Sequence, residues 1–187
     1  MSLDRRAFLA RATSIVLCSG AVLAVLNACS GDAVLSKEAN GTRQLGQDVV
    51  RKLDKPREEW EKVLSDGAYD VLFNESTERA GSSPLDREKR TGTFVCAACF
   101  LPLFESNAKF DSGSGWPSFY QPIAGHVATK RDFKLIWPRT EYHCARCGGH
   151  QGHIFDDGPK PTGKRYCNNG IALQFVPETE PLPEMRG

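Results

Sequence analysis

Two pairs of cysteines constrain the fold of this chain most strongly. The first pair is Cys96 and Cys99, and the second is Cys144 and Cys147. Each has the spacing Cys-x-x-Cys, and 44 residues separate the two pairs. A turn of this kind offers two sulfur ligands, and two such turns complete a tetrahedral zinc site. We therefore expect one structural Zn²⁺ per chain, which fastens two distant parts of a single domain together. Disulfides and an iron–sulfur cluster are the competing interpretations.

Downstream of residue 29, Cys167 is the one cysteine left without a partner once these four cysteines are assigned to a metal. It lies two residues after Arg165 and follows the segment His150-x-x-His153. The thiolate is the reactive form of cysteine, and a nearby cation favours it. In an extended segment, Arg165 and Cys167 share one face. The pattern predicts a nucleophile at Cys167, with histidines that titrate near neutral pH as proton donors. An inert core cysteine is the alternative.

The amino-terminal segment has the layout of a bacterial export signal. Arg5 and Arg6 form a twin-arginine motif, and residues 12–28 follow as 17 residues without charge. We expect residues 1–29 to direct export by the twin-arginine route, to the periplasm or to a membrane-anchored lipoprotein. An uncleaved membrane anchor is the alternative. Cys29 stands where a lipoprotein signal is cleaved and lipidated, whereas Cys18 is interpreted as a small hydrophobic residue.

The remaining chain has the composition of one loop-rich domain. After residue 29, it carries 21 basic and 22 acidic side chains, so no basic excess favours nucleic acid as a partner. Eleven prolines and 17 glycines in the whole chain favour a mainly β, α+β fold over a helical bundle. We expect a tether over residues 30–53 and a folded domain over residues 54–187. Contact with a membrane is expected only through the signal or a lipid anchor.

Local patterns predict short helices followed by an antiparallel β core. Helices are expected over residues 56–64 and 66–73, where Trp60, Val63 and Leu64 fall on one face of the first. Strands are expected over residues 94–96, 127–129, 134–137, 140–144, 154–155 and 171–176.

Five motifs, read together, resemble the B-type methionine sulfoxide reductases, which are peptide-methionine (R)-S-oxide reductases. They are Gly92-Thr93-Phe94-Val95-Cys96-x-x-Cys99, Ser112-Gly113-x-Gly115-Trp116-Pro117-Ser118-Phe119, Cys144-x-x-Cys147, Gly149-His150-x-Gly152-His153-Ile154-Phe155-Asp156-Asp157-Gly158 and Arg165-Tyr166-Cys167-x-Asn169. The resemblance covers residues 56–177. It implies that oxidised proteins or peptides containing methionine-R-sulfoxide are the substrates.

The resemblance also implies a role for each site residue. Cys167 attacks the sulfoxide and becomes a sulfenic acid, and His153 is the acid. His150 and Asn169 orient the site, Arg165 favours the thiolate, and Asp157 holds a histidine in its working tautomer. Trp116 packs against the substrate methyl group, with Phe175 nearby. We expect the enzyme to be a monomer.

The chain departs from the family pattern at two places. Many members carry a resolving cysteine where Ser114 stands here, and no cysteine lies between residues 30 and 95. We therefore expect an external thiol, such as a thioredoxin-like protein, to reduce the sulfenic acid. Gln151, Asn168 and Gly170 occupy positions that are usually apolar or small, which alters the polarity of the pocket in a direction that the sequence does not give.

Two other functions fit parts of the pattern. A zinc-ribbon binding module without catalysis explains the four cysteines, but it leaves the order of Cys167 and the histidines unexplained. A thiol–disulfide oxidoreductase that uses a Cys-x-x-Cys pair is the second alternative. It predicts no bound zinc.

Overall fold

The computed structural model describes residues 50–133 and 138–187. The chain divides into two units, residues 1–43 and 44–187, and every described residue belongs to the second. The expected export signal, Cys18, Cys29 and the strand over residues 134–137 lie outside the described residues. Among the helices that the structure describes, none is long and apolar enough to cross a membrane.

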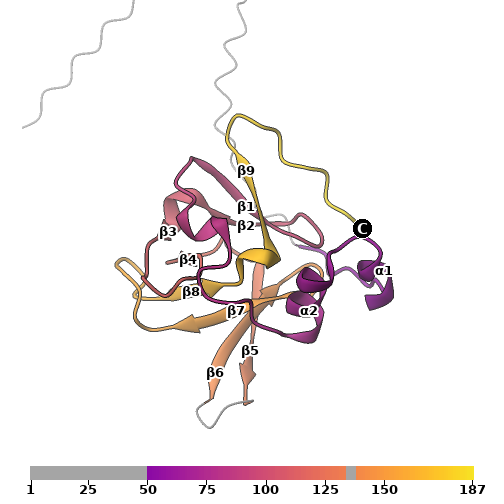
Figure 1. The fold of residues 1–187 in the computed structure, drawn as a ribbon, viewed down its shortest axis with the longest axis horizontal. Coiled ribbons are helices and arrows are strands. Elements are labelled where there is room, and N and C mark those ends of the chain that lie inside the picture. Colours follow the sequence, from indigo (N-terminus) through magenta and orange to yellow (C-terminus); the bar gives the residue numbers. More distant parts are fainter. Residues whose placement is uncertain (1–49, 134–137) are drawn as a thin grey trace, which may run out of the picture. The chain divides into compact units, whose positions relative to one another are not determined.

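Two antiparallel sheets and a few short helices make up the fold (Figure 1). The smaller sheet has the strand order β2-β1-β9, and the larger has the order β3-β4-β8-β7-β6-β5. The described helices are α1 (Arg57–Glu61), α2 (Asp66–Asn74), η1 (Pro84–Arg87), η2 (Ser106–Ala108) and η3 (Gly170–Ala172). The strands are β1 (Gly92–Cys96), β2 (Pro102–Glu105), β3 (Lys109–Phe110), β4 (Ser118–Phe119), β5 (Val127–Asp132), β6 (Arg139–Cys144), β7 (His150–Phe155), β8 (Arg165–Asn168) and β9 (Leu173–Pro177). The mainly β fold class expected from the sequence is confirmed.

Aromatic side chains join the two sheets. Phe104 of β2 stacks on Phe119 of β4 with 4.1 Å between ring centroids, and Phe94 of β1 meets Phe119 edge-on at 4.9 Å. Tyr142 of β6 is also fully buried in this cluster. Stacked and edge-on aromatic pairs bury large apolar areas in fixed geometry. The packing therefore holds the sheet that carries one cysteine turn against the sheet that carries the other.

The helices begin and end as local chemistry dictates. Ser65 caps α2 by accepting a hydrogen bond from the Ala68 amide at 3.3 Å, and Glu75 ends it in the left-handed conformation. Buried residues of α2 pack on β7 and η3. The structure differs from the sequence expectation at both ends of the first helix, because α1 begins at Arg57 and ends at Glu61.

Residues just before position 54, where the sequence predicts the start of the domain, contact the core. Val50 and Leu53 pack against the core, and the Leu53 amide donates a hydrogen bond to the Arg146 carbonyl at 2.6 Å. The end of the expected tether is therefore fastened to the second cysteine turn. The polar composition of this segment predicts a tether, whereas the contact depends on two apolar side chains and one backbone hydrogen bond.

Gly152 permits β7 and β8 to pair closely. A Cβ atom at this position would lie 1.9 Å from the backbone oxygen of Cys167, far inside van der Waals contact. The same pairing sets His153 opposite Cys167. Glycine is therefore required where the two strands meet.

We predict that Gly152→Ala destabilises the fold by about 1–3 kcal/mol, because the added methyl group forces the two strands apart. Urea unfolding would measure this loss. Gly67→Ala is the control, since its added Cβ meets only the end of the flexible Ile171 side chain, at 3.1 Å. Equal unfolding midpoints for Gly152→Ala and the unaltered chain would show that the strands do not need this close approach.

Candidate active site and metal centre

Cys167 lies at the centre of the large sheet. In the strand register it faces His153 of β7 on one side and Ser118 of β4 on the other. Its side chain is half-buried and lines a pocket of about 120 Å³. The pocket is lined by Thr77, Trp116, Arg139, Gly152, His153, Phe155, Cys167, Asn168 and Asn169. The structure thus gathers Cys167, His153, Trp116 and Asn169, which the sequence placed together.

One loop fixes two walls of the pocket. The Trp116 indole nitrogen donates to the Glu78 carbonyl at 3.2 Å, and the Glu78 amide donates to Asn169 Oδ1 at 3.0 Å. The Glu78 carboxylate accepts hydrogen bonds from the amides of Gly170 and Ile171. Glu78 and Thr77 were not singled out from the sequence, because a polar loop gives no periodic signal.

Asp157 binds Arg165 rather than a histidine, which corrects the sequence expectation. Arg165 Nε and Nη2 donate to the two carboxylate oxygens of Asp157 at 2.8 and 2.9 Å. The guanidinium also lies over the Phe155 ring, 4.2 Å from its centroid. This fork-like pairing and stacking fix the arginine beside Cys167.

Two buried carboxylates hold the histidines instead. His153 Nε2 lies 2.8 Å from Asp132 Oδ2, and Arg139 Nη2 donates to the same oxygen at 2.8 Å. His150 is 2 % exposed and its Nδ1 lies 2.9 Å from Glu141 Oε1. Asp132 and Glu141 were missed from the sequence. An acidic residue at an inward position of a strand is the signal that could have found Glu141.

The pKa of Glu141 is below its ordinary value. Burial acts to raise this pKa, but the hydrogen bonds from His150 and Lys130 and the charges of both residues together outweigh burial and lower it. Lys130 Nζ lies 2.9 Å from Glu141 Oε2. Glu141 is therefore an anion that anchors His150, whose ring centroid lies 5.4 Å from that of His153. His150 supports the pocket from behind and is not among its lining residues.

Burial dominates the pKa values of Cys167 and His153. It raises the pKa of the Cys167 thiol above its ordinary value, although the Arg165 charge and a hydrogen bond from Ser114 act in the opposite direction. Burial lowers the pKa of His153, against the hydrogen bond with Asp132. Near neutral pH, both shifts favour the uncharged forms, a protonated thiol and a neutral imidazole.

Phe175 lies elsewhere, contrary to the expectation that it is near Trp116. It belongs to β9 of the small sheet, where its ring packs against Phe94 with centroids 5.0 Å apart and lies beneath Arg90. The aromatic ring that does line the pocket beside Trp116 is Phe155. The sequence order places Phe175 close to Cys167 along the chain, but η3 turns the chain into the other sheet.

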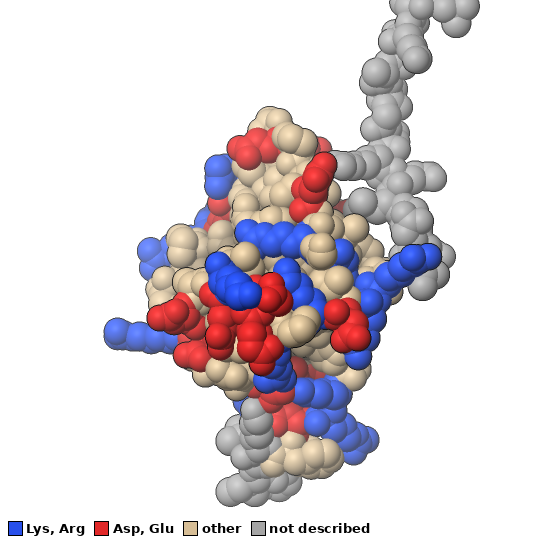
Figure 2. Space-filling view, turned by 90° about the vertical axis from the view of Figure 1, so that its right-hand side faces the viewer, with Lys and Arg blue, Asp and Glu red and all other residues tan. Residues whose placement is uncertain are grey.

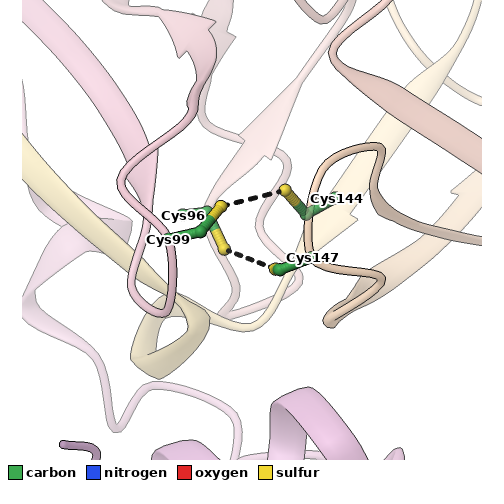
Figure 3. Close-up of side chains that lie close together, drawn as sticks. All are labelled: Cys96, Cys99, Cys144 and Cys147. Atoms are coloured by element: carbon green, nitrogen blue, oxygen red, sulfur yellow. Dashed lines mark hydrogen bonds between the residues drawn. The ribbon is translucent and has the colours of Figure 1, made fainter. Parts of the chain in front are cut away.

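The four paired cysteines converge from two turns that have the same backbone geometry (Figure 3). The Phe100 amide bonds the Cys96 carbonyl and the Gly148 amide bonds the Cys144 carbonyl, both at 2.9 Å. Phe100 and Gly148, which each follow a turn, have positive φ values of 62° and 73°. The sequence motif Cys-x-x-Cys is thus built twice in one conformation.

The sulfur atoms fit a tetrahedral metal ion. Cys96 Sγ lies 3.7 Å from Cys147 Sγ, Cys99 Sγ lies 3.5 Å from Cys144 Sγ, and all four lie within 4.8 Å of one another. Zn–S bonds of about 2.3 Å at tetrahedral angles separate sulfurs by about 3.8 Å. The four residues can therefore hold one zinc ion, with no ligand position left open for substrate.

The surface around α1 and α2 carries both signs of charge. On the face shown in Figure 2, Lys and Arg alternate with Asp and Glu and form no continuous basic stripe. Exposed pairs such as Lys62 with Glu59 contribute to this mixture.

Comparison with known proteins agrees with the site geometry. The family model described as the SelR domain matches residues 64–177. A peptide methionine sulfoxide reductase MsrB of Methanosarcina barkeri is 48 % identical over 131 residues, which are 70 % of this chain and 92 % of that protein. The protein of the same name from Bradyrhizobium diazoefficiens is 51 % identical over 128 residues, 68 % of this chain and 92 % of its own.

A plant relative shows the same likeness over a shorter share of its length. The chloroplastic peptide methionine sulfoxide reductase B1 of Arabidopsis thaliana is 50 % identical over 118 residues, which are 63 % of this chain and 58 % of that protein. The matched region contains both cysteine turns and the strand that carries Cys167. The chain therefore belongs to the family of B-type peptide methionine sulfoxide reductases.

Proposed function

We propose that this chain reduces methionine-R-sulfoxide in proteins and peptides to methionine, with Cys167 as the nucleophile. The observation that carries this proposal is the pocket itself, in which Cys167 and His153 face each other beside the Trp116 ring. The ring offers an apolar surface to the substrate methyl group. A pocket of about 120 Å³ accommodates a single small side-chain terminus and not a folded surface.

The resting protonation state suits the reaction. The Cys167 sulfur attacks the sulfoxide sulfur, and the thiol proton passes by way of His153 to the sulfoxide oxygen. The attack forms a bond between the two sulfurs. That bond and the substrate S–O bond then break as the oxygen, now a hydroxyl, passes to the Cys167 sulfur, which becomes a sulfenic acid, and the thioether leaves. The substrate sulfur gains two electrons and the Cys167 sulfur loses two. Thiol and sulfoxide become sulfenic acid and thioether without exchange of protons with solvent.

An external thiol completes the cycle in this proposal. Of the five cysteines that the structure describes, four are gathered in the metal cluster and the fifth is Cys167. Ser114, which acts to lower the pKa of Cys167, stands where a resolving cysteine stands in many relatives. Two thiols of a thioredoxin-like protein would reduce the sulfenic acid, forming their own disulfide and releasing water and the Cys167 thiol.

The four-cysteine cluster is proposed to hold Zn²⁺ in a structural role. When bound, the ion supplies cross-links between the turns after β1 and β6, and this chain's pocket residues carry the chemistry. Cys96, Cys99 and Cys144 are fully buried. That burial disfavours a thiol–disulfide oxidoreductase, which needs an accessible sulfur.

The R-specific reaction is predicted to depend on Cys167. The assay supplies N-acetylated, amidated methionine R- and S-sulfoxides with dithiothreitol, and we expect the chain to consume the R form alone. Cys167→Ser should abolish this consumption, because a hydroxyl is a poor nucleophile here. Chromatography of the two sulfoxides would measure this. Ser106→Ala is the control, since Ser106 lies outside the pocket. Activity that survives in Cys167→Ser favours the oxidoreductase alternative, and no activity in the unaltered chain favours the binding module.

The reactivity of Cys167 is predicted to follow a raised pKa. Alkylation by iodoacetamide should accelerate with pH through a pKa above the ordinary thiol value, because burial opposes the thiolate. Arg165→Met should move this profile to higher pH and slow alkylation several-fold at neutral pH, because the favourable charge is lost. Mass spectrometry of Cys167 labelling would measure the rate.

Lys164→Met is the matched control for that profile. Lys164 pairs with Asp156 at the surface. Its substitution by methionine removes one positive charge, as Arg165→Met does, but one residue away. Superimposable pH profiles for Arg165→Met and Lys164→Met would show that Arg165 does not act on the thiol.

We also propose that the protein is exported by the twin-arginine route and works outside the inner membrane as a monomer. Arg5, Arg6 and the uncharged segment over residues 12–28 support this location. A protein translocated already folded would carry its zinc with it, so its four cysteines would arrive protected from oxidation.

The mature amino terminus is predicted to begin at or near Cys29. Mass spectrometry of the protein from membrane and periplasmic fractions would measure it, with an Arg5→Lys/Arg6→Lys variant retained inside the cell as the control. A lipid-bearing Cys29 would establish the anchor. A full-length amino terminus that begins at Met1 in the exported protein would contradict cleavage.

A further inference from the structure

Two fully buried amide side chains connect the cysteine cluster with β8, the strand that carries Cys167. Gln151 of β7 and Asn168 of β8 are both 0 % exposed. Burial of an amide is unfavourable unless its donors and acceptors are paired. Their presence therefore calls for a specific set of partners, which the structure supplies in one connected row.

The hydrogen bonds of this row run in one direction. The Tyr142 hydroxyl donates to Asn168 Oδ1 at 2.6 Å, and Asn168 Nδ2 donates to Gln151 Oε1 at 3.3 Å. Gln151 Nε2 then donates to Cys96 Sγ at 3.5 Å. Each amide turns its oxygen towards the preceding donor, which leaves its nitrogen facing the next acceptor. The row begins at a hydroxyl of the aromatic core and ends at a metal-cluster sulfur.

Backbone contacts secure the two amides from both sides. Asn168 Nδ2 also donates to the Asn169 carbonyl at 2.8 Å. The Asn169 amide and its side-chain nitrogen both donate to the Gln151 carbonyl, at 2.8 and 3.0 Å. Gln151 is therefore held where β7 meets β8, and its side chain is aimed at the sulfur of β1.

We propose that Gln151 is a hydrogen-bond donor to the metal-bound Cys96 sulfur and that Asn168 positions it, forming a bridge between the metal centre and the strand of Cys167. This proposal rests on the zinc centre proposed above. An N–H group aimed at a ligand sulfur draws charge from it and fixes its direction, and partners of this kind support the retention of the metal. In a row of aligned hydrogen bonds each bond polarises the next, so Asn168 strengthens the donor.

Cobalt substitution gives a direct spectroscopic readout of the sulfur. In the Co²⁺-loaded chain, we expect Gln151→Met to move the sulfur-to-cobalt charge-transfer band to longer wavelength, because the sulfur electrons lose a stabilising donor. In the Zn²⁺-loaded chain, we expect the same variant to release zinc to excess EDTA about tenfold faster. Methionine is nearly isosteric with glutamine and has no donor. Asn107→Leu is the control, since its amide is exposed and contacts Glu105.

The role of Asn168 is tested by combining variants. Asn168→Leu alone should move the band and speed zinc release in the same direction as Gln151→Met, but less. Added to Gln151→Met, it should cause no further change, because it acts only through Gln151. The double variant leaves neither amide without its partner, and Tyr142→Phe in both backgrounds removes the buried hydroxyl that would otherwise lose its acceptor.

Three results would overturn the bridge. An unmoved band and unchanged zinc release in Gln151→Met, or in the double variant should the single one not fold, would show that Gln151 does not act on the sulfur. If Asn168→Leu moved the band and sped zinc release by the same amount in the unaltered chain and in Gln151→Met, Asn168 would act by a route other than Gln151. Failure of the unaltered chain to bind either ion would overturn the metal centre itself, and the bridge with it.

Discussion

The pairing of β7 with β8 is the contact on which this molecule depends. It sets His153 directly opposite Cys167, and the next pair along the ladder, Gly152 with Asn168, allows the close approach. The adjacent pairing of β8 with β4 sets Ser118 on the other side of the thiol. A shift of one residue would turn Cys167 to the opposite face of the sheet, away from the pocket. The register therefore determines that Cys167 faces the pocket and His153.

Burial and charge act against each other at the thiol, and burial is the larger effect. It raises the pKa of Cys167, while Arg165, fixed by Asp157 and Phe155, lowers it. The consequence is a neutral pair, thiol and imidazole, rather than a thiolate and an imidazolium. In the reduction proposed above, one proton moves from sulfur to oxygen, and such a pair would carry that proton into the reaction. In that proposal, Arg165 would stabilise the negative charge that forms on the sulfur.

The sequence predicted the parts of the molecule that local pattern determines. The two cysteine turns, the β-rich core and the separation of Cys167 from the other four sulfurs follow from spacing and composition. The partners of the histidines did not, since Glu141 comes from β6, beside β7, and Asp132 from β5, one strand further, and only the folded sheet brings them together. For the same reason, Asp157 was assigned to a histidine although Arg165 is its partner. Phe175 was misplaced because η3 carries the chain from one sheet to the other.

Gln151 and Asn168 show a different limit. As single letters they read as departures from an apolar pattern, and each alone would be a buried polar group at a cost to stability. Together with Tyr142 they satisfy one another and reach the Cys96 sulfur. Only the fold reveals that the two departures compensate each other.

In the proposed reaction, Cys167 takes the oxygen of the substrate, and it is the one thiol among the described residues that lies outside the metal cluster. The most direct measurement is mass spectrometry of the zinc-loaded chain after one turnover with methionine-R-sulfoxide, without reductant and with dimedone to trap sulfenic acid. We expect one dimedone adduct, located at Cys167, and four unmodified metal-bound cysteines. A disulfide between Cys167 and another cysteine, or an adduct elsewhere, would contradict it.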